Sequence, residues 1–232
     1  MKTKYILAIE TSTEHLGVAL CTTDGHEISS YNDLAYRRLS DDLHIAIDKV
    51  MTQAKTGYDL LEFIAVTRGP GSFTSIRLGI SAAKGLAFTQ KLPIVSLTSL
   101  ETLAWQYMQG TSIDASKGTL CVWIEAHGGN IYVQNFNAQG SLASPVSMKA
   151  CDAGSLLKAG DILIGNGVIN HREDIPEGVH CPEGYAYINP SQLAKLAQRR
   201  YSDKTDDVNN TTALYVHPLN YNKTYNKDGS KK

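Results

Sequence analysis

Residues 66–88 read VTRGPGSFTSIRLGISAAKGLAF, and this stretch decides how the chain folds. The apolar run at 60–66 that leads into it is long enough for a buried strand but too short for an amphipathic helix. A Gly-Pro-Gly turn at 69–71 ends that strand, because glycine permits positive φ and proline fixes its own φ. A hydroxyl at Ser72 or Thr74 can then cap a helix. The stretch therefore predicts a strand, a tight turn and a helix.

The predicted helix carries little side-chain bulk, since glycine, serine and alanine fill much of it. An interior glycine costs about 1 kcal/mol relative to alanine, so its presence indicates that another backbone comes close. A flat stripe follows helical spacing through Ser75, Gly79, Ala82 and Leu86. The stripe either docks a helix of another protein or packs closely on the protein's own sheet. Because a helix has two broad faces, one face can dock another protein while the other packs on the sheet.

Composition bounds the class of protein. The chain has 232 residues, 42% hydrophobic and 19% charged, which is typical of a globular protein in one large or two small domains. A net charge of -1 gives no basic field that would indicate nucleic-acid binding. The four scattered cysteines form no Cys-x-x-Cys pair, so we expect reduced thiols in a cytoplasmic protein. No apolar run is long enough for a signal peptide or a membrane span.

Taken in order, the apolar pattern predicts an α/β protein whose two halves share one topology. In the first half we expect strands near 6–9, 16–21, 27–31, 60–66 and 92–97, and helices at 41–55, 73–88 and 99–108. In the second half we expect strands at 120–124, 131–136, 145–149, 162–164 and 214–216, and helices near 153–158 and 190–201. The predicted subdomains are 1–110 and 111–218, followed by a flexible polar tail at 219–232.

Acids end the first strand of each half. Glu10 is followed by Thr11 and Ser12, and Glu125 ends the equivalent strand. An acid with hydroxyls beside it can hold hydrated magnesium next to a phosphate, and a nucleotide-splitting cleft keeps two such acids at matching points. The alternative, commoner for so short a pattern, is that both are ordinary polar residues at strand ends.

Other chemistry finds little support. A helical metal pair with His44 would need a second histidine at Ser40 or Asp48, and no Gly-x-Ser-x-Gly motif frames a serine. We therefore predict no catalytic residue and no metal ligand. Lysines and tyrosines mix in the tail at 221–232, where they can contact RNA or, as charge runs usually do, solvate a free end.

Several motifs together resemble the TsaB (YeaZ) family. They are ILAIETST at 6–13, TRGPGSFTSIRLG at 67–79 with GLA at 85–87, IEAHGGNIY at 124–132, GNG at 165–167 and ALYV at 213–216. The match is strong in the first half and weaker in the second. The resemblance implies a duplicated actin-like ATPase fold (ASKHA, ribonuclease H-like) built of two βββαβα-type subdomains.

The resemblance also implies a function. The chain would be a non-catalytic scaffold that activates the TsaD ATPase, and with TsaE the two would place threonylcarbamoyl on the adenosine next to the anticodon of tRNAs reading A-starting codons. TsaD would bind the ATP and the metal, the complex would engage the tRNA, and this chain alone would have no activity. Two helices would form the interface, which would also make a homodimer when TsaD is absent. The expected interface residues are Leu43, Ile45, Ala46, Ser75, Ile76, Gly79, Ala82, Ala83 and Leu86.

This chain departs from the family pattern at the loops that would hold an ion or nucleotide. Glu10 stands where the family usually has aspartate, and Glu125-Ala126-His127 stands for Asp-Ala-Arg. We therefore interpret these loops as vestigial, at Glu10, Thr11, Ser12, Glu125, Gly165 and Gly167. Two other classes compete. An ATP-dependent phosphotransferase of this fold needs intact phosphate loops, and a peptidase needs a catalytic constellation.

Overall fold

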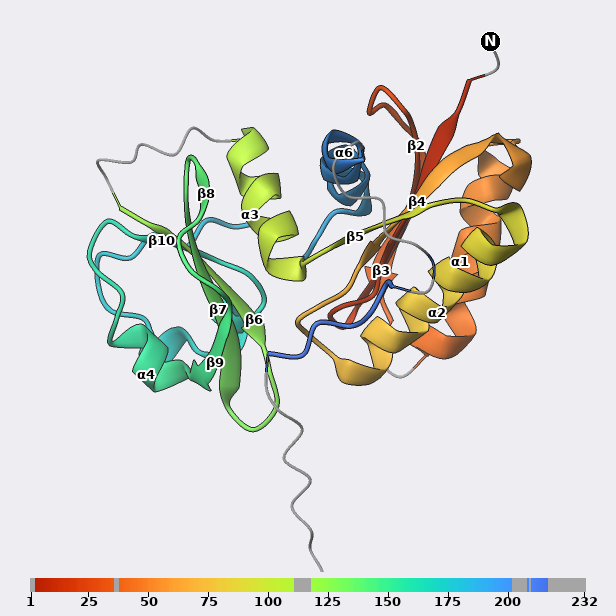
Figure 1. Cartoon of the computed structure of the whole chain (residues 1–232). Helices are drawn as coiled ribbons and strands as arrows, with labels where there is room; N and C mark the ends of the chain where they lie inside the picture. The colour runs from red at the N-terminus through yellow and green to blue at the C-terminus, as the bar shows by residue number, and fades with distance from the viewer. Residues whose placement is uncertain (1–2, 36–37, 111–117, 202–207, 209, 217–232) are drawn as a thin grey trace, which may run out of the picture.

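The computed structural model describes residues 3–35, 38–110, 118–201, 208 and 210–216. Two mixed sheets lie side by side, with helices α3 (Ser99–Gly110) and α6 (Pro190–Arg200) between them (Figure 1). Within the described ranges, no helix combines the length and apolarity needed to cross a membrane.

The first sheet has the strand order β3-β2-β1-β4-β5. Its strands are β1 (Tyr5–Glu10), β2 (His15–Thr22), β3 (Glu27–Leu34), β4 (Leu61–Thr67) and β5 (Ile94–Leu97). The first three are antiparallel neighbours, whereas β4 runs parallel to β1 and β5 parallel to β4. Helices cover both faces, so β1 is apolar on both sides: Ile6 and Ala8 pack in one core, Leu7 and Ile9 in the other.

The second sheet repeats this topology. Its order is β10-β6-β7-β8, with β9 also paired to β7. Strand β6 has an antiparallel neighbour in β7 and a parallel neighbour in β10, as β1 has in β2 and β4. The duplicated α/β fold is therefore confirmed. The strands are β6 (Leu120–Glu125), β7 (Asn130–Asn137), β8 (Gly140–Ser141), β9 (Val146–Lys149) and β10 (Ile162–Ile164).

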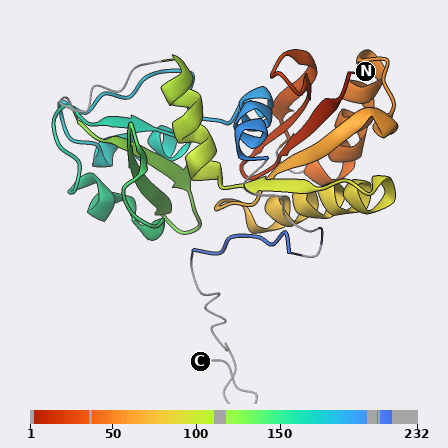
Figure 2. The same cartoon turned by 45° about the horizontal axis from the view of Figure 1, so that its top comes forward.

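The helices differ in length between the halves. Helices α1 (Leu39–Gln53) and α2 (Phe73–Gln90) cover the outer face of the first sheet, whereas α4 (Ala150–Gly154) and α5 (Gly167–Asn170) are short (Figures 1 and 2). Two 3-10 turns, η1 (Tyr58–Leu60) and η2 (Arg172–Asp174), complete the described elements. The first half therefore presents the only long outer helices of the described chain.

One hydrophobic core joins the two sheets. Ile6 of β1, Leu103 of α3, Val122 of β6 and Leu193 of α6 belong to the same buried cluster. Helix α6 comes from the second half, yet it packs on β1 and β2 of the first sheet. The proposed division at residue 110 falls next to 111–117, which lie outside the described residues, as does the tail at 219–232. The domain boundaries therefore stay a prediction.

Two local expectations were wrong. Helix α1 begins at Leu39, two residues before the expected start at 41, and Arg38 at its N-cap makes no side-chain capping bond. Residues 214–216 form no strand. Instead the Leu214 N–H donates to the Arg68 carbonyl at 2.7 Å, and this holds the C-terminal segment along the start of α2.

Candidate functional site

The small-residue stripe of α2 packs inside the protein. Ile76, Gly79, Ala82 and Ala83 are buried between α2 and the first sheet. A Cβ on Gly79 would lie 2.2 Å from the Thr11 hydroxyl oxygen, so this glycine is required by close approach to the loop after β1. For this stripe, close packing on the protein's own sheet is the correct explanation.

This corrects most of the expected interface. Six of the nine residues are buried in the chain's own core and are not available to a partner: Leu43, Ala46, Ile76, Gly79, Ala82 and Ala83. Ser75 and Leu86 are half-buried. Only Ile45 of α1 is well exposed, at 64%. The reason is that α1 and α2 turn their regular apolar stripes toward the sheet.

A different row of α2 lies away from the sheet. Thr74, Leu78, Ser81, Gly85 and Phe88 follow one another at helical spacing, and we call them the outer row. Four of them are exposed, whereas Leu78 is half-buried against the core; Thr74 and Leu78 also line a cleft between the two halves. Phe88 is 78% exposed, and nothing lies within 4 Å of the Cβ position of Gly85. Ile45 of α1 lies apart from this row, in a groove that it lines with Tyr31 and Lys49 beside β3. Small residues lie at helical spacing on both faces of α2. The sequence alone therefore could not predict which of the two faces lies away from the sheet.

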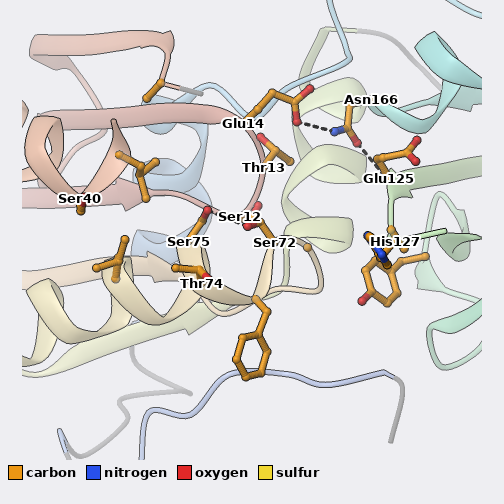
Figure 3. A pocket seen from close by; sticks show the side chains of 17 residues that line it. Ser12, Thr13, Glu14, Ser40, Ser72, Thr74, Ser75, Glu125, His127 and Asn166 are labelled. Carbon is orange, nitrogen blue, oxygen red and sulfur yellow. Dashed lines mark hydrogen bonds between the residues drawn. The ribbon is translucent and has the colours of Figure 1, made fainter. Parts of the chain in front are cut away.

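A cleft of about 1110 Å³ separates the two halves (Figure 3). The loop after β1 and the first turns of α1 and α2 form one wall, with hydroxyls at Ser12, Ser40 and Ser72. The end of β6 and Asn166 form the other wall. Its described lining includes no lysine or arginine.

Glu10 does not face this cleft. Its side chain is 1% exposed, and its Oε1 accepts a hydrogen bond from the Ser12 N–H at 2.8 Å. Its Oε2 has no hydrogen-bond partner among the described atoms. Burial raises the pKa of Glu10 above its ordinary value of 4.5, although hydrogen bonds from the Ser12 hydroxyl and N–H partly oppose the shift. Glu10 is therefore a buried acid that favours its neutral form rather than an ion ligand in the cleft.

The other expected loop residues have structural partners as well. The Thr11 hydroxyl donates to the Ser75 carbonyl at 2.8 Å. Gly165 has φ of 102°, and a Cβ there would lie 2.0 Å from the Trp123 carbonyl oxygen. Gly167 also packs on Trp123. These two glycines let the chain turn tightly against β6.

The two acids that do line the cleft are held by the protein's own groups. Glu125 lies 3.1 Å from His171 Nε2 and accepts from Asn170 Nδ2 at 3.4 Å. Glu14 accepts from Asn166 Nδ2 at 3.0 Å (Figure 3) and from the Tyr187 hydroxyl at 2.7 Å. Glu14 and His171 carried no sequence signal, since their partners are more than 40 residues away or lie in irregular loops.

The charges of the cleft lining bear on nucleotide binding. A polyphosphate is usually held by basic side chains or a metal ion, and the described lining offers two carboxylates and His127 but no lysine or arginine. In the described ranges, no group of three or more histidine, cysteine, aspartate or glutamate residues is arranged to hold a metal. The most distinctive exposed feature is therefore the outer row of α2.

Comparison with known proteins identifies relatives. The family model for TsaD, tRNA N6-adenosine threonylcarbamoyltransferase, matches residues 29–160. The tRNA threonylcarbamoyladenosine biosynthesis protein TsaB of Bacillus subtilis is 30% identical over 208 residues, 84% of this chain and 87% of that protein. TsaB of Haemophilus influenzae is 36% identical, and TsaB of Escherichia coli 33% identical. These two matches span about half the length of each relative, 43% and 52%.

Solved structures agree on the fold. YeaZ from Pseudomonas aeruginosa superposes with a TM-score of 0.76 at 22% identity, over 91% of this chain and 100% of that chain. An inorganic polyphosphate/ATP-glucomannokinase from Arthrobacter, an actin-like kinase, superposes with a TM-score of 0.51 at 9% identity, over 87% and 100%. At these identities the similarity shows the fold alone, which is the actin-like ATPase fold. Together with the TsaB relative that it matches over most of its length, this shows that the chain belongs to the TsaB (YeaZ) family of tRNA threonylcarbamoyladenosine biosynthesis proteins.

Proposed function

We propose that this protein is the non-catalytic subunit that pairs with a TsaD-like ATPase during threonylcarbamoyl transfer to tRNA. The observation that carries the proposal is the outer row of α2, where a monomer would place charged side chains. The cleft supports it, because its acids are engaged internally and its described lining has no lysine or arginine. The nucleotide, the metal and the chemistry then belong to the partner.

The outer row suits contact with a related pair of helices. Serine and glycine at its centre let another helix approach closely, while the exposed Phe88 fills a groove beside it. The TsaD model matches a range of this chain that includes α1 and α2, so a TsaD-like partner has equivalent elements. The two chains can therefore pack helix pair against helix pair about a pseudo-two-fold axis.

The other partners that we propose depend on this pairing with a TsaD-like ATPase. A TsaE-like ATPase and the tRNA, one that reads A-starting codons, engage the assembled complex in the cytoplasm. When the partner is absent, the same self-complementary surface pairs with a second copy of this chain, because a two-fold contact needs only one patch.

The test uses Gly85→Arg. Its new side chain enters open space in the monomer, so the fold tolerates it, but it holds a docked helix away. Gln198→Arg on α6 is the matched control, since it adds the same side chain at an exposed helical position far from α2. We expect size-exclusion chromatography with the TsaD-like protein of the same organism to show a complex for the wild type and for Gln198→Arg. Gly85→Arg should reduce the affinity at least about tenfold, which is the scale of an interface hot spot. A complex with Gly85→Arg as tight as that of the wild type would contradict the proposal.

A further inference from the structure

The loop between β1 and β2, residues 11–14, touches both halves of the molecule. It forms part of the first-half wall of the cleft, and it is short enough that its four residues act as one unit. One end packs on α2 and the other reaches across the cleft.

On the far side of the cleft, Glu14 binds two groups of the second half. Its carboxylate accepts from Asn166 Nδ2 at 3.0 Å and from the Tyr187 hydroxyl at 2.7 Å. Asn166 is 3% exposed and fixed at its other end, because its Oδ1 accepts from the Glu125 N–H at 2.9 Å. These side chains form a continuous bridge from the β1–β2 loop to the end of β6 (Figure 3).

Tyr187 is also held in place. Its ring stacks on His15, the residue after Glu14, with ring centroids 3.9 Å apart. Its carbonyl accepts from Gln106 Nε2 of α3 at 3.1 Å. A carboxylate with two oriented donors makes strong hydrogen bonds, so Glu14 adds a polar tie across the cleft to the hydrophobic core that already joins the halves.

On the near side, the loop is in direct contact with the first turns of α2. The Ser72 N–H donates to the Ser12 carbonyl at 2.8 Å, and the Thr11 hydroxyl donates to the Ser75 carbonyl at 2.8 Å. Gly71 and Gly79 allow this approach, since a Cβ on Gly71 would lie 2.0 Å from the Ser12 carbonyl oxygen. The loop cannot move without moving the start of α2.

We propose that the 11–14 loop couples the angle between the two halves to the position of α2, with Glu14 as the latch. Because α2 carries the outer row, the latch then regulates partner binding, and this consequence rests on the proposed function. Glu14 is a positioning residue that acts through the 11–14 loop and α2. The affinity of a partner that docks on α2 therefore depends on the angle between the two halves.

Amide hydrogen exchange by NMR tests the coupling on the isolated protein. The Glu125 amide reports the far side of the cleft, and the Ser72 amide reports the contact with α2. Glu14→Gln removes the charge and so weakens the two hydrogen bonds that Glu14 makes with Asn166 and Tyr187. Tyr187→Phe removes one bond and keeps the ring, so it preserves the test if Glu14→Gln folds poorly. Glu183→Gln, an exposed acid in the loop before Tyr187, is the matched control.

We expect Glu14→Gln to speed exchange of both amides about tenfold, Tyr187→Phe to speed both less, and Glu183→Gln to change neither. We also expect Glu14→Gln to weaken binding of the TsaD-like partner several-fold. Unchanged exchange at Glu125 would show that Glu14 is no latch, and faster exchange at Glu125 alone would show that the loop does not couple. The exchange data need no partner, so they judge the coupling even if Gly85→Arg shows that the docking surface lies elsewhere.

Discussion

At the scale of single residues, side-chain direction separates acids that look alike in the sequence. Glu10 and Glu125 both end the first strand of a half, but Glu10 lies on the face of β1 that α6 covers. Side chains alternate along a strand, so Glu10 follows Ile6 and Ala8 into the interior. Glu125 projects into the cleft, where His171 meets it.

Burial of Glu10 makes stability depend on pH. In the unfolded chain Glu10 loses its proton near pH 4.5, whereas the folded protein retains the proton to higher pH. The free energy of unfolding is therefore not reduced by Glu10 below pH 4.5, and it falls as the pH rises toward the pKa of Glu10 in the folded protein. Glu10→Gln keeps the shape and has no proton to lose. We expect it to raise the Tm by a few degrees at pH 8 and to change it little at pH 4.

Thermal unfolding followed by circular dichroism at the two pH values measures this effect. Wild-type protein at each pH is the reference. If Glu10→Gln lowers the Tm at pH 8, a charged Glu10 stabilises the fold, and the assignment of a buried neutral acid is wrong.

At the scale of elements, small residues have different roles on the two faces of α2. Gly79 is covered by Thr11, whereas Gly85 borders open space. Alanine should therefore have opposite effects at the two positions. Gly85→Ala should stabilise by about 1 kcal/mol through helix propensity. Gly79→Ala should destabilise by about 2 kcal/mol or more, because the added methyl group overlaps the Thr11 hydroxyl.

Urea unfolding of the two variants makes the comparison within one helix. Equal effects at both positions would mean that Gly79 does not depend on close approach to the β1–β2 loop. The same pair explains why Gly85, and not Gly79, is the position at which arginine tests partner docking without damaging the fold.

Much of this architecture was predictable from the pattern of the sequence. Strands 60–66, 120–124 and 162–164 and the helix from Phe73 appear within one or two residues of expectation, because apolar runs and glycine turns define them locally. The outward phase of α2 was not predictable, since small residues occupy both of its faces. The bridge from Glu14 to Asn166 was not predictable either, because it joins residues that are 152 positions apart.

At the scale of the whole molecule, the cleft of this actin-like fold is lined by hydroxyls and two carboxylates. Glu14 and Glu125 are engaged by Asn166, Tyr187 and His171, and the described lining has no lysine or arginine. We therefore expect the isolated protein to hydrolyse ATP far below about 1 s⁻¹, an ordinary enzyme rate. Turnover above that rate by protein freed of contaminating ATPases would favour the phosphotransferase class.

The central claim is that this subunit contributes a docking surface and no chemistry. The most direct measurement is threonylcarbamoyl transfer to tRNA, reconstituted with the TsaD-like and TsaE-like proteins of the same organism. We predict that transfer requires this protein, that Glu125→Gln supports it at the wild-type rate, and that Gly85→Arg loses most of it. Transfer that is lost with Glu125→Gln but retained with Gly85→Arg would contradict the claim, because the cleft rather than α2 would then carry the function.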